Sequence, residues 1–217
     1  GLGDVYKRQP LDISDTKKIL SQAYKKGFKS IAIVLLHGYR YQEHERQISI
    51  IANEIGFTQI SVSHQISPLM KIIPRGDTTV VDAYLSPILR RYVNQIRTKL
   101  GTSQSNLSQL MFMQSNGGLT DANHFQGKDA ILSGPAGGVV GMVKTGENIG
   151  LNKLIGFDMG GTSTDVCHFN GEYERTLETE VTGVRIKSPM MLINTVAAGG
   201  GSILHFDGSR YRVGPES

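Results

Sequence analysis

Two apolar, strand-like runs in the second half of the sequence are separated by a short polar loop rich in glycine and hydroxyl groups. The runs are Lys153–Met159 and Val166–Phe169, and the loop between them reads GGTSTD. Walker A and Rossmann nucleotide loops need a helix after the loop and their own spacing, GxxxxGKS/T or GxGxxG. This segment has neither feature, so we expect a strand–loop–strand hairpin there.

The loop and its flanks carry groups that bind a phosphate together with a metal ion. Two glycines let the backbone turn sharply and present N–H groups, and three hydroxyls add neutral donors. The carboxylates on either side suit Mg²⁺, directly or through water. A plain hairpin with a polar turn is the alternative. We therefore predict phosphate-binding residues between two catalytic carboxylates: Gly160, Gly161, Thr162, Ser163 and Thr164, between Asp158 and Asp165.

Glycine is concentrated in the second half of the chain, where 19 of the 26 glycines lie from Gly117 onwards. One cluster places four glycines on one side of a predicted helix, which indicates close approach of a neighbouring helix or of a ligand: Gly134, Gly137, Gly138 and Gly141. Another cluster predicts either a contact with the nucleotide or substrate, or a flexible bend: Gly199, Gly200, Gly201 and Ser202.

The first third of the chain has the pattern of an α/β unit. Leu11–Tyr24 and Gln42–Ile55 have helical apolar spacing, and Gly56 ends the second helix. Lys29–Leu36 and Gln59–Ser63 are predicted strands, so the order is strand, helix, strand.

Further elements follow a boundary predicted at Pro74–Asp77. Thr78–Leu100 has the period of a long helix, which Pro87 should kink or restart. Leu107–Met113 is a predicted short strand. The next predicted helix begins at Ser133-Gly134-Pro135 and ends near Asn148. After a turn at Asn170-Gly171, residues 172–181 are expected to return as a strand.

Composition excludes several classes of protein. The net charge is +4, but no run of cations is longer than two, so we expect no nucleic-acid partner. No apolar stretch reaches the ~18–20 residues of a membrane span, so we expect no membrane insertion. The single cysteine, Cys167, excludes an internal disulfide framework and suggests a cytoplasmic location.

The strand that ends in an acidic residue, followed by Gly-Gly-Thr and a returning strand, resembles the phosphate hairpin of the actin–hexokinase–heat-shock-chaperone ATPases. The resemblance implies an α/β fold of that type. It also implies that the fold is incomplete here, with the chain contributing parts of two lobes.

Five motifs in the same order and spacing make the resemblance more specific. They are SGPAGGVVG (133–141), GFDMGGTSTDV (156–166), TVAAGGGSI (195–203), TTVVDAYLSPILRRY (78–92) and SNGGL (115–119). Together they resemble the hydantoinase/oxoprolinase family. Three further segments are most similar to its ATP-dependent 5-oxoproline-hydrolysing members: 35–45, 74–79 and 206–217.

The resemblance implies ATP-driven opening of a cyclic amide, with 5-oxo-L-proline, ATP and water giving L-glutamate, ADP and phosphate in the presence of Mg²⁺. It implies that Asp158 orients Mg²⁺ or its waters, and that Asp165 supports that shell or positions water. N-methylhydantoinase and acetone carboxylase subunits are alternatives within the family. A non-enzymatic nucleotide-switch module on the same fold is a further alternative.

Family members are longer than this chain, so the resemblance implies a fragment. Residues 1–9 have the character of a non-native segment, and residues 10–75 would be the last part of the family's N-terminal α/β domain. Residues 76–217 would be the first part of the hydantoinase A/oxoprolinase domain. We expect the fragment alone to be inactive, and the complete protein to be oligomeric or paired with a hydantoinase B-type subunit or domain.

Overall fold

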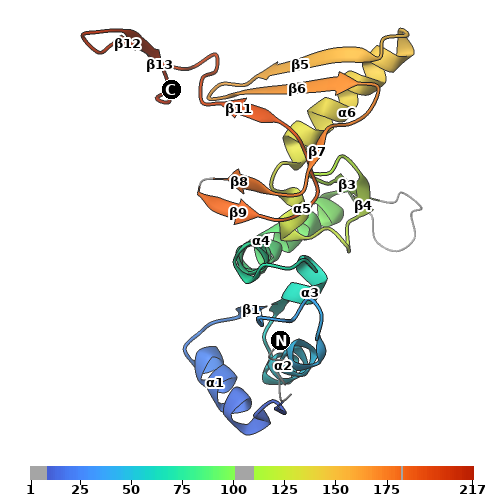
Figure 1. Ribbon diagram of the computed structural model, residues 1–217, viewed down its shortest axis with the longest axis vertical. Coiled ribbons are helices and arrows are strands. Elements are labelled where there is room, and N and C mark those ends of the chain that lie inside the picture. The colour runs from blue at the N-terminus through green and yellow to red at the C-terminus, as the bar shows by residue number, and fades with distance from the viewer. Residues whose placement is uncertain (1–8, 101–109, 182) are drawn as a thin grey trace, which may run out of the picture.

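The computed structural model describes residues 9–100, 110–181 and 183–217. Helices and strands are mixed along the chain and form three successive tiers (Figure 1). The predicted non-native segment lies outside the described residues except for Gln9. Within the described part of the chain, no helix is both long and apolar enough to cross a membrane.

The N-terminal tier is the strand–helix–strand unit that the sequence predicts. β1 (Ser30–Ile33) and β2 (Gln59–Val62) are parallel neighbours. α2 (Glu43–Ile55) connects them and ends at Gly56, whose φ of 105° favours glycine. α1 (Ile13–Lys25) packs on this unit through a small apolar core formed by Leu20, Ile51, Ala52 and Phe57.

β1 is shorter than the strand predicted over Lys29–Leu36, because it ends at Ile33. Side chains form hydrogen bonds with the N–H and carbonyl of Leu35, which would pair with a neighbouring strand if β1 were longer. Its N–H donates to Glu45 Oε1 at 2.8 Å, and its carbonyl accepts from the Arg75 guanidinium. Buried side-chain bonds therefore end the strand, although the apolar run continues.

α4 (Ile72–Lys99) follows the short helix α3 (Ser63–Ile66) and begins before the predicted start at Thr78. Pro74 lies in its first turn, where a missing N–H costs no helical hydrogen bond. The helix then continues across Pro87. The boundary expected between residues 75 and 76 lies within α4 and stays a prediction.

A buried polar network joins α4 to the N-terminal tier. The Arg75 side chain is 0% exposed and donates to Ser63 Oγ at 3.1 Å. It also donates to the carbonyls of Leu36 and Leu69, each at 3.0 Å. The Ser63 hydroxyl in turn donates to Glu45 Oε1 at 2.6 Å. Carbonyls and a hydroxyl thus accept all the hydrogen bonds named for the guanidinium. The Ser63 hydroxyl lies between Arg75 and Glu45, because it accepts from the first and donates to the second.

Glu45 is fully buried in this network and remains the acceptor of several hydrogen bonds. Burial by itself raises the pKa of Glu45, but bonds from Ser63, the Leu35 N–H and His64 outweigh it and hold the pKa below its ordinary value. His64 Nδ1 lies 2.7 Å from Glu45 Oε2. A carboxyl whose pKa is lowered by folding stabilises the fold above its unfolded pKa, and this contribution disappears as the pH falls through the folded-state pKa.

The C-terminal tier is a three-stranded antiparallel sheet covered on one face by α6 (Ser133–Asn148) (Figure 1). The strand order is β11 (Asn194–Val196), β6 (Thr164–Asn170) and β5 (Lys153–Met159). α6 and the sheet bury an apolar cluster with Ala136, Val139 and Met191 at its centre.

Two glycines allow this close packing between α6 and the sheet. An added Cβ at Gly146 would lie 2.5 Å from the Leu154 side chain. One at Gly156 would lie 2.4 Å from Cys167 Sγ and 2.7 Å from Met142 Sδ. A side chain at either position would force these neighbouring side chains to move.

Short elements connect the tiers. Of the strand predicted at Leu107–Met113, residues 107–109 lie outside the described residues, and β3 begins at Met111. A turn over residues 207–210 joins the last two strands. The bounds are β3 (Met111–Met113), β4 (Leu119–Asp121), α5 (Gly127–Ala130), β7 (Arg175–Thr176), β8 (Thr179–Val181), β9 (Val184–Ile186), β10 (Met190–Met191), β12 (Leu204–Phe206) and β13 (Tyr211–Val213).

The strand expected to return over residues 172–181 is wrong. After the turn, only Tyr173 bridges back to Phe169; β7 then pairs with β10, and β8 with β9. The neighbour of β6 is β11 instead. The reason is the apolar cluster under α6, because Ile193, just before β11, packs into it, whereas residues 174–180 are mostly polar.

The outer face of the sheet is uncovered by the described residues. Ile155, Phe157 and Met159 alternate along β5 and are 77%, 66% and 56% exposed. Within the described parts of the chain, β5 is also an edge strand, with a neighbour on one side only. Large apolar side chains on a free edge favour association with another strand or layer.

The Glu45 network predicts an acid-dependent stability. Glu45→Gln should lower the free energy of unfolding at neutral pH by about 2–3 kcal/mol, because an amide cannot accept all the bonds that the carboxylate receives. The difference from wild type should shrink as the pH falls below the ordinary value of 4.5. Urea unfolding, monitored by circular dichroism at several pH values from neutral to acidic, measures this difference in the free energy of unfolding.

Glu43→Gln is the matched control, since Glu43 is exposed near the start of the same helix. It should leave both the stability and its pH dependence unchanged. Equal acid dependence in the two variants would contradict the role assigned to Glu45.

Candidate functional site

The loop between β5 and β6 is a tight hairpin turn, shorter than the predicted six-residue loop. Thr164 lies opposite Met159, and Asp165 lies opposite Asp158, so β6 begins at Thr164 and not at Val166. The turn itself is residues 160–163, closed by the Gly160 N–H donating to the Ser163 carbonyl at 2.9 Å. The two predicted catalytic carboxylates are therefore cross-strand partners on one face of the sheet.

The outer side of the turn offers unused hydrogen-bond donors. The N–H groups of Gly161, Thr162 and Ser163 have no partner among the described residues, and the hydroxyls of Thr162 and Ser163 have none there either. An added Cβ at Gly161 would meet nothing within 4 Å. Consecutive open N–H groups at a turn form a concave site for anionic oxygens.

The glycine cluster at residues 199–201 lies directly against the inner side of this turn, where the carbonyls of Gly160 and Gly161 point. The Gly200 N–H donates to the Gly160 carbonyl at 2.9 Å, and the Gly201 N–H donates to the Gly161 carbonyl at 2.8 Å. An added Cβ at Gly199 would lie 2.6 Å from the Gly160 carbonyl oxygen. Close approach of two backbones thus requires glycine here, and we call residues 199–201 the glycine clamp.

The clamp also orients the open donors of the turn. In a planar trans peptide, a carbonyl and the N–H of the next residue point in opposite directions. The carbonyls of Gly160 and Gly161 point toward the clamp, where they accept hydrogen bonds. The N–H groups of Gly161 and Thr162 therefore point away from it, toward open space.

Other predicted phosphate ligands are engaged inside the protein. The Thr164 side chain is buried, and its hydroxyl donates to the Ala198 carbonyl at 2.6 Å. Ser202 Oγ accepts from the Gly199 N–H at 2.8 Å. The structure thus brings the predicted phosphate ligands together, but they have two different roles. Residues 161–163 present open donors, whereas Thr164 and residues 199–202 support the turn.

The two carboxylates have different surroundings. Asp165 Oδ1 accepts from the Thr195 hydroxyl at 2.6 Å, whereas Asp158 has no hydrogen-bonding side-chain partner in the described parts of the chain. An added Cβ at Gly138 would lie 3.6 Å from Asp158 Oδ2. Sequence reasoning gave no role to Thr195, because the pairing of β11 with β6 is not visible in the motif that contains it.

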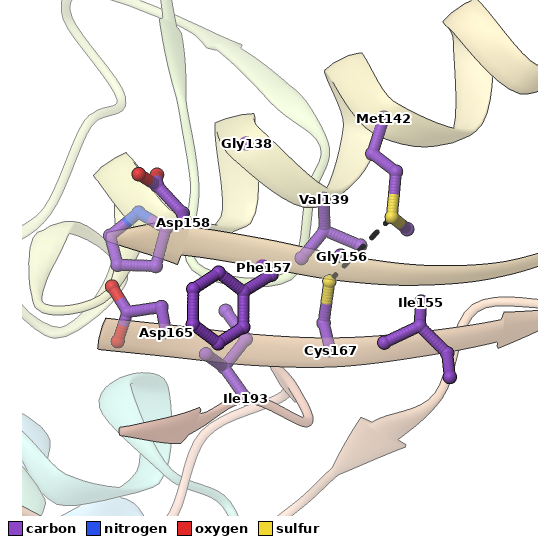
Figure 2. A pocket seen from close by; sticks show the side chains of 11 residues that line it. Gly138, Val139, Met142, Ile155, Gly156, Phe157, Asp158, Asp165, Cys167 and Ile193 are labelled. Carbon is purple, nitrogen blue, oxygen red and sulfur yellow. Dashed lines mark hydrogen bonds between the residues drawn. The ribbon is translucent and has the colours of Figure 1, made fainter. Parts of the chain in front are cut away.

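A pocket of about 360 Å³ lies between α6 and the hairpin, with both carboxylates at one end (Figure 2). Pro135, Val139, Met142 and Ile193 form much of its apolar lining. Cys167 Sγ lies 4.0 Å from Met142 Sδ on its wall, and burial raises the pKa of this thiol. A protonated thiol beside a thioether is an apolar wall and not a nucleophile.

The glycines of α6 do not pack against another helix in the described structure. An added Cβ at Gly134 or Gly141 would meet nothing within 4 Å, and one at Gly137 would be in ordinary contact with Met113. Gly138 lines the pocket. The position on α6 where packing requires glycine is Gly146, which the sequence did not single out.

A metal site made only of protein ligands is not present among the described residues, since no group of three or more His, Cys, Asp and Glu side chains converges there. Mg²⁺ at nucleotide sites needs fewer protein ligands, because it keeps several waters and binds one or two carboxylates together with phosphate oxygens. Asp158 and Asp165 fit that smaller donor set.

Comparison with known proteins identifies the family. The sequence profile described as Hydantoinase/oxoprolinase matches residues 75–217, and that of the Hydantoinase/oxoprolinase N-terminal region matches residues 4–56. The chain is 48% identical to the 5-oxoprolinase of Saccharomyces cerevisiae over 95% of its length. It spans 16% of that relative.

Two solved structures share the fold. The ATP-dependent caprolactamase from Pseudomonas jessenii matches with a TM-score of 0.85 and 28% identity, over 100% of this chain and 32% of that one. Nucleotide-free acetone carboxylase matches with a TM-score of 0.79 and 25% identity, over 96% and 30%. The matched profile covers well over half of the residues, so the chain belongs to the hydantoinase/oxoprolinase family.

Proposed function

We propose that this chain is the part of an ATP-dependent 5-oxoprolinase that carries a phosphate-binding hairpin. The observation that supports it best is the turn with three open N–H groups beside two opposed carboxylates. This turn occurs in a chain that is 48% identical to a 5-oxoprolinase. The open donors of residues 161–163 would receive phosphate oxygens of ATP, and the glycine clamp would hold them in place.

The proposal includes an actin–hexokinase–heat-shock-chaperone type of fold in the complete protein. Support comes from the antiparallel hairpin that joins an acidic strand end, Gly-Gly-Thr and a second strand. In such a fold the nucleotide lies between two lobes. Since the chain spans 16% of its yeast relative, the second lobe's contribution would come from other parts of the protein.

The chemistry requires ATP because a five-membered lactam is a poor electrophile. In the proposed reaction the amide oxygen attacks the γ-phosphorus, and ADP leaves. Water then attacks the activated ring carbon, the C–N bond breaks and the nitrogen takes up a proton. A second water releases phosphate and leaves L-glutamate. The open N–H groups of Gly161, Thr162 and Ser163 would stabilise the charge on the transferring phosphoryl group, where most of the catalytic effect arises.

Mg²⁺ fits the carboxylate end of the pocket. Asp158 would hold the ion or its waters, because its oxygens accept no side-chain bond within the described chain. The ion would neutralise phosphate charge. Asp165, which is already tied to Thr195, is less free to move toward a metal.

Substrate choice separates this proposal from its rivals. The complete protein should hydrolyse ATP when 5-oxo-L-proline is added, and release one glutamate for each ADP. Stimulation by a hydantoin, by caprolactam, or by acetone with bicarbonate would instead identify another activity of the family. Nucleotide binding with no stimulation by any of them would favour the nucleotide-switch alternative. A cytoplasmic location and a hydantoinase B-type partner also remain proposals.

The glycine clamp predicts an indirect effect on nucleotide binding. Gly199→Ala should weaken Mg-ATP binding by the complete protein roughly tenfold or more, because the new Cβ meets backbone atoms that cannot move without tilting the turn. The contact would be 2.6 Å from the Gly160 oxygen. Isothermal titration calorimetry measures the dissociation constant.

Gly134→Ala is the matched control for this variant. A Cβ at Gly134 meets nothing within 4 Å, so affinity should stay at the wild-type level. Wild-type affinity in Gly199→Ala, in protein of unchanged melting temperature, would rule out the clamp as the support of the phosphate site.

A further inference from the structure

The two carboxylates of the hairpin are held unequally, although they face each other across one pair of strands. Asp158 is exposed and has no side-chain hydrogen bond within the described residues. Asp165 is half-buried, and one of its oxygens, Oδ1, accepts the Thr195 hydroxyl at 2.6 Å. Both line the same pocket (Figure 2). One carboxylate is therefore free to adapt, whereas the other is held at one oxygen by a hydrogen bond.

Backbone pairing sets the contact between Thr195 and Asp165. β11 and β6 are antiparallel, and these two residues are direct partners in the register. Direct partners place their Cβ atoms about 4.5–5.5 Å apart, within reach of a short hydroxyl. A hydroxyl that donates to a carboxylate at this distance forms a charge-assisted bond, about twice as strong as a neutral one. Threonine is also restricted at χ1, so little freedom is lost when the bond forms.

The same segment fixes the hairpin at two further places. The Ala198 carbonyl accepts from the Thr164 hydroxyl, and the N–H groups of the glycine clamp donate to carbonyls of the turn. Residues 195–201 thus hold the phosphate-binding turn by its backbone and Asp165 by its side chain. Movement of β11 would displace both together.

We infer that Thr195 is a positioning residue for Asp165 in the ATP-dependent reaction. By holding Oδ1, Thr195 leaves Oδ2 as the one free acceptor that Asp165 offers to a reacting water at the pocket it lines. Asp158 is left for the cation. A group that accepts a proton from water must present one lone pair in a defined direction, whereas a hydrated cation tolerates a mobile carboxylate. This inference rests on the proposed function.

A purely structural role for Thr195 gives different results. If the hydroxyl only strengthened the sheet, its removal would lower stability and leave the turnover of the folded enzyme unchanged. If it positions Asp165, turnover falls and nucleotide affinity stays, because the turn amides and the clamp are untouched.

The experiment compares Thr195→Val and Thr195→Ser in the complete protein. 5-Oxoproline-dependent ATP hydrolysis should show kcat lowered roughly tenfold in the valine variant, with KM for ATP unchanged. The serine variant should regain most of the wild-type kcat. Thr176→Val is the matched control, since the Thr176 hydroxyl donates to the Glu178 carbonyl at 2.8 Å and not to Asp165 or the turn. Its kcat should be that of wild type.

The variant Asp165→Asn distinguishes failure of the positioning role of Thr195 from failure of the proposed function. If Asp165→Asn loses activity while Thr195→Val retains the wild-type kcat, the positioning role is overturned and the proposed function stands. A serine variant no better than valine also overturns it, because the hydroxyl would not be responsible. If the wild-type protein shows no 5-oxoproline-dependent ATP hydrolysis, the proposed function fails and this inference fails with it.

Discussion

The contact between the hairpin turn and the glycine clamp is the constraint on which the candidate site depends. Two hydrogen bonds from the clamp hold the carbonyls of Gly160 and Gly161 on the inner side of the turn. Peptide planarity then fixes the N–H groups that follow on the outer side. A phosphate site made of main-chain donors needs this support, because a free glycine turn would present its amides in many directions. The clamp removes that freedom before any ligand binds.

The rest of the molecule positions this contact. α6 packs closely on β5 and β6 because Gly146 and Gly156 lack side chains, and β11 continues the sheet as far as the clamp. At the other end of the chain, the buried network of Glu45, Ser63 and Arg75 joins α4 to the first α/β unit. The apolar face of β5 is not covered by the described residues.

Local patterns in the sequence were sufficient for the hairpin, for α6 and for the strand–helix–strand unit, since each rests on periodicity and turn residues within about 20 positions. Long-range contacts were not predictable in this way. The sequence could not show that Gly199 faces Gly160, or that Thr195 pairs with Asp165, because both depend on the register of β11. The early end of β1 also depends on long-range contacts, because the side chains of Glu45 and Arg75 bind the main chain of Leu35. Arg75 is likewise a buried structural residue with partners far along the chain, such as the Leu36 carbonyl.

Amide chemical shifts test the central claim most directly. In the complete protein, with ¹⁵N confined to the segment that this chain represents, titration with Mg-ATP should move the N–H signals of Gly161, Thr162 and Ser163 most strongly. The amides of Gly200 and Gly201 should stay hydrogen-bonded and protected from exchange with solvent. Unshifted signals at residues 161–163, whether or not other residues respond, would contradict the assignment of this turn as the phosphate site.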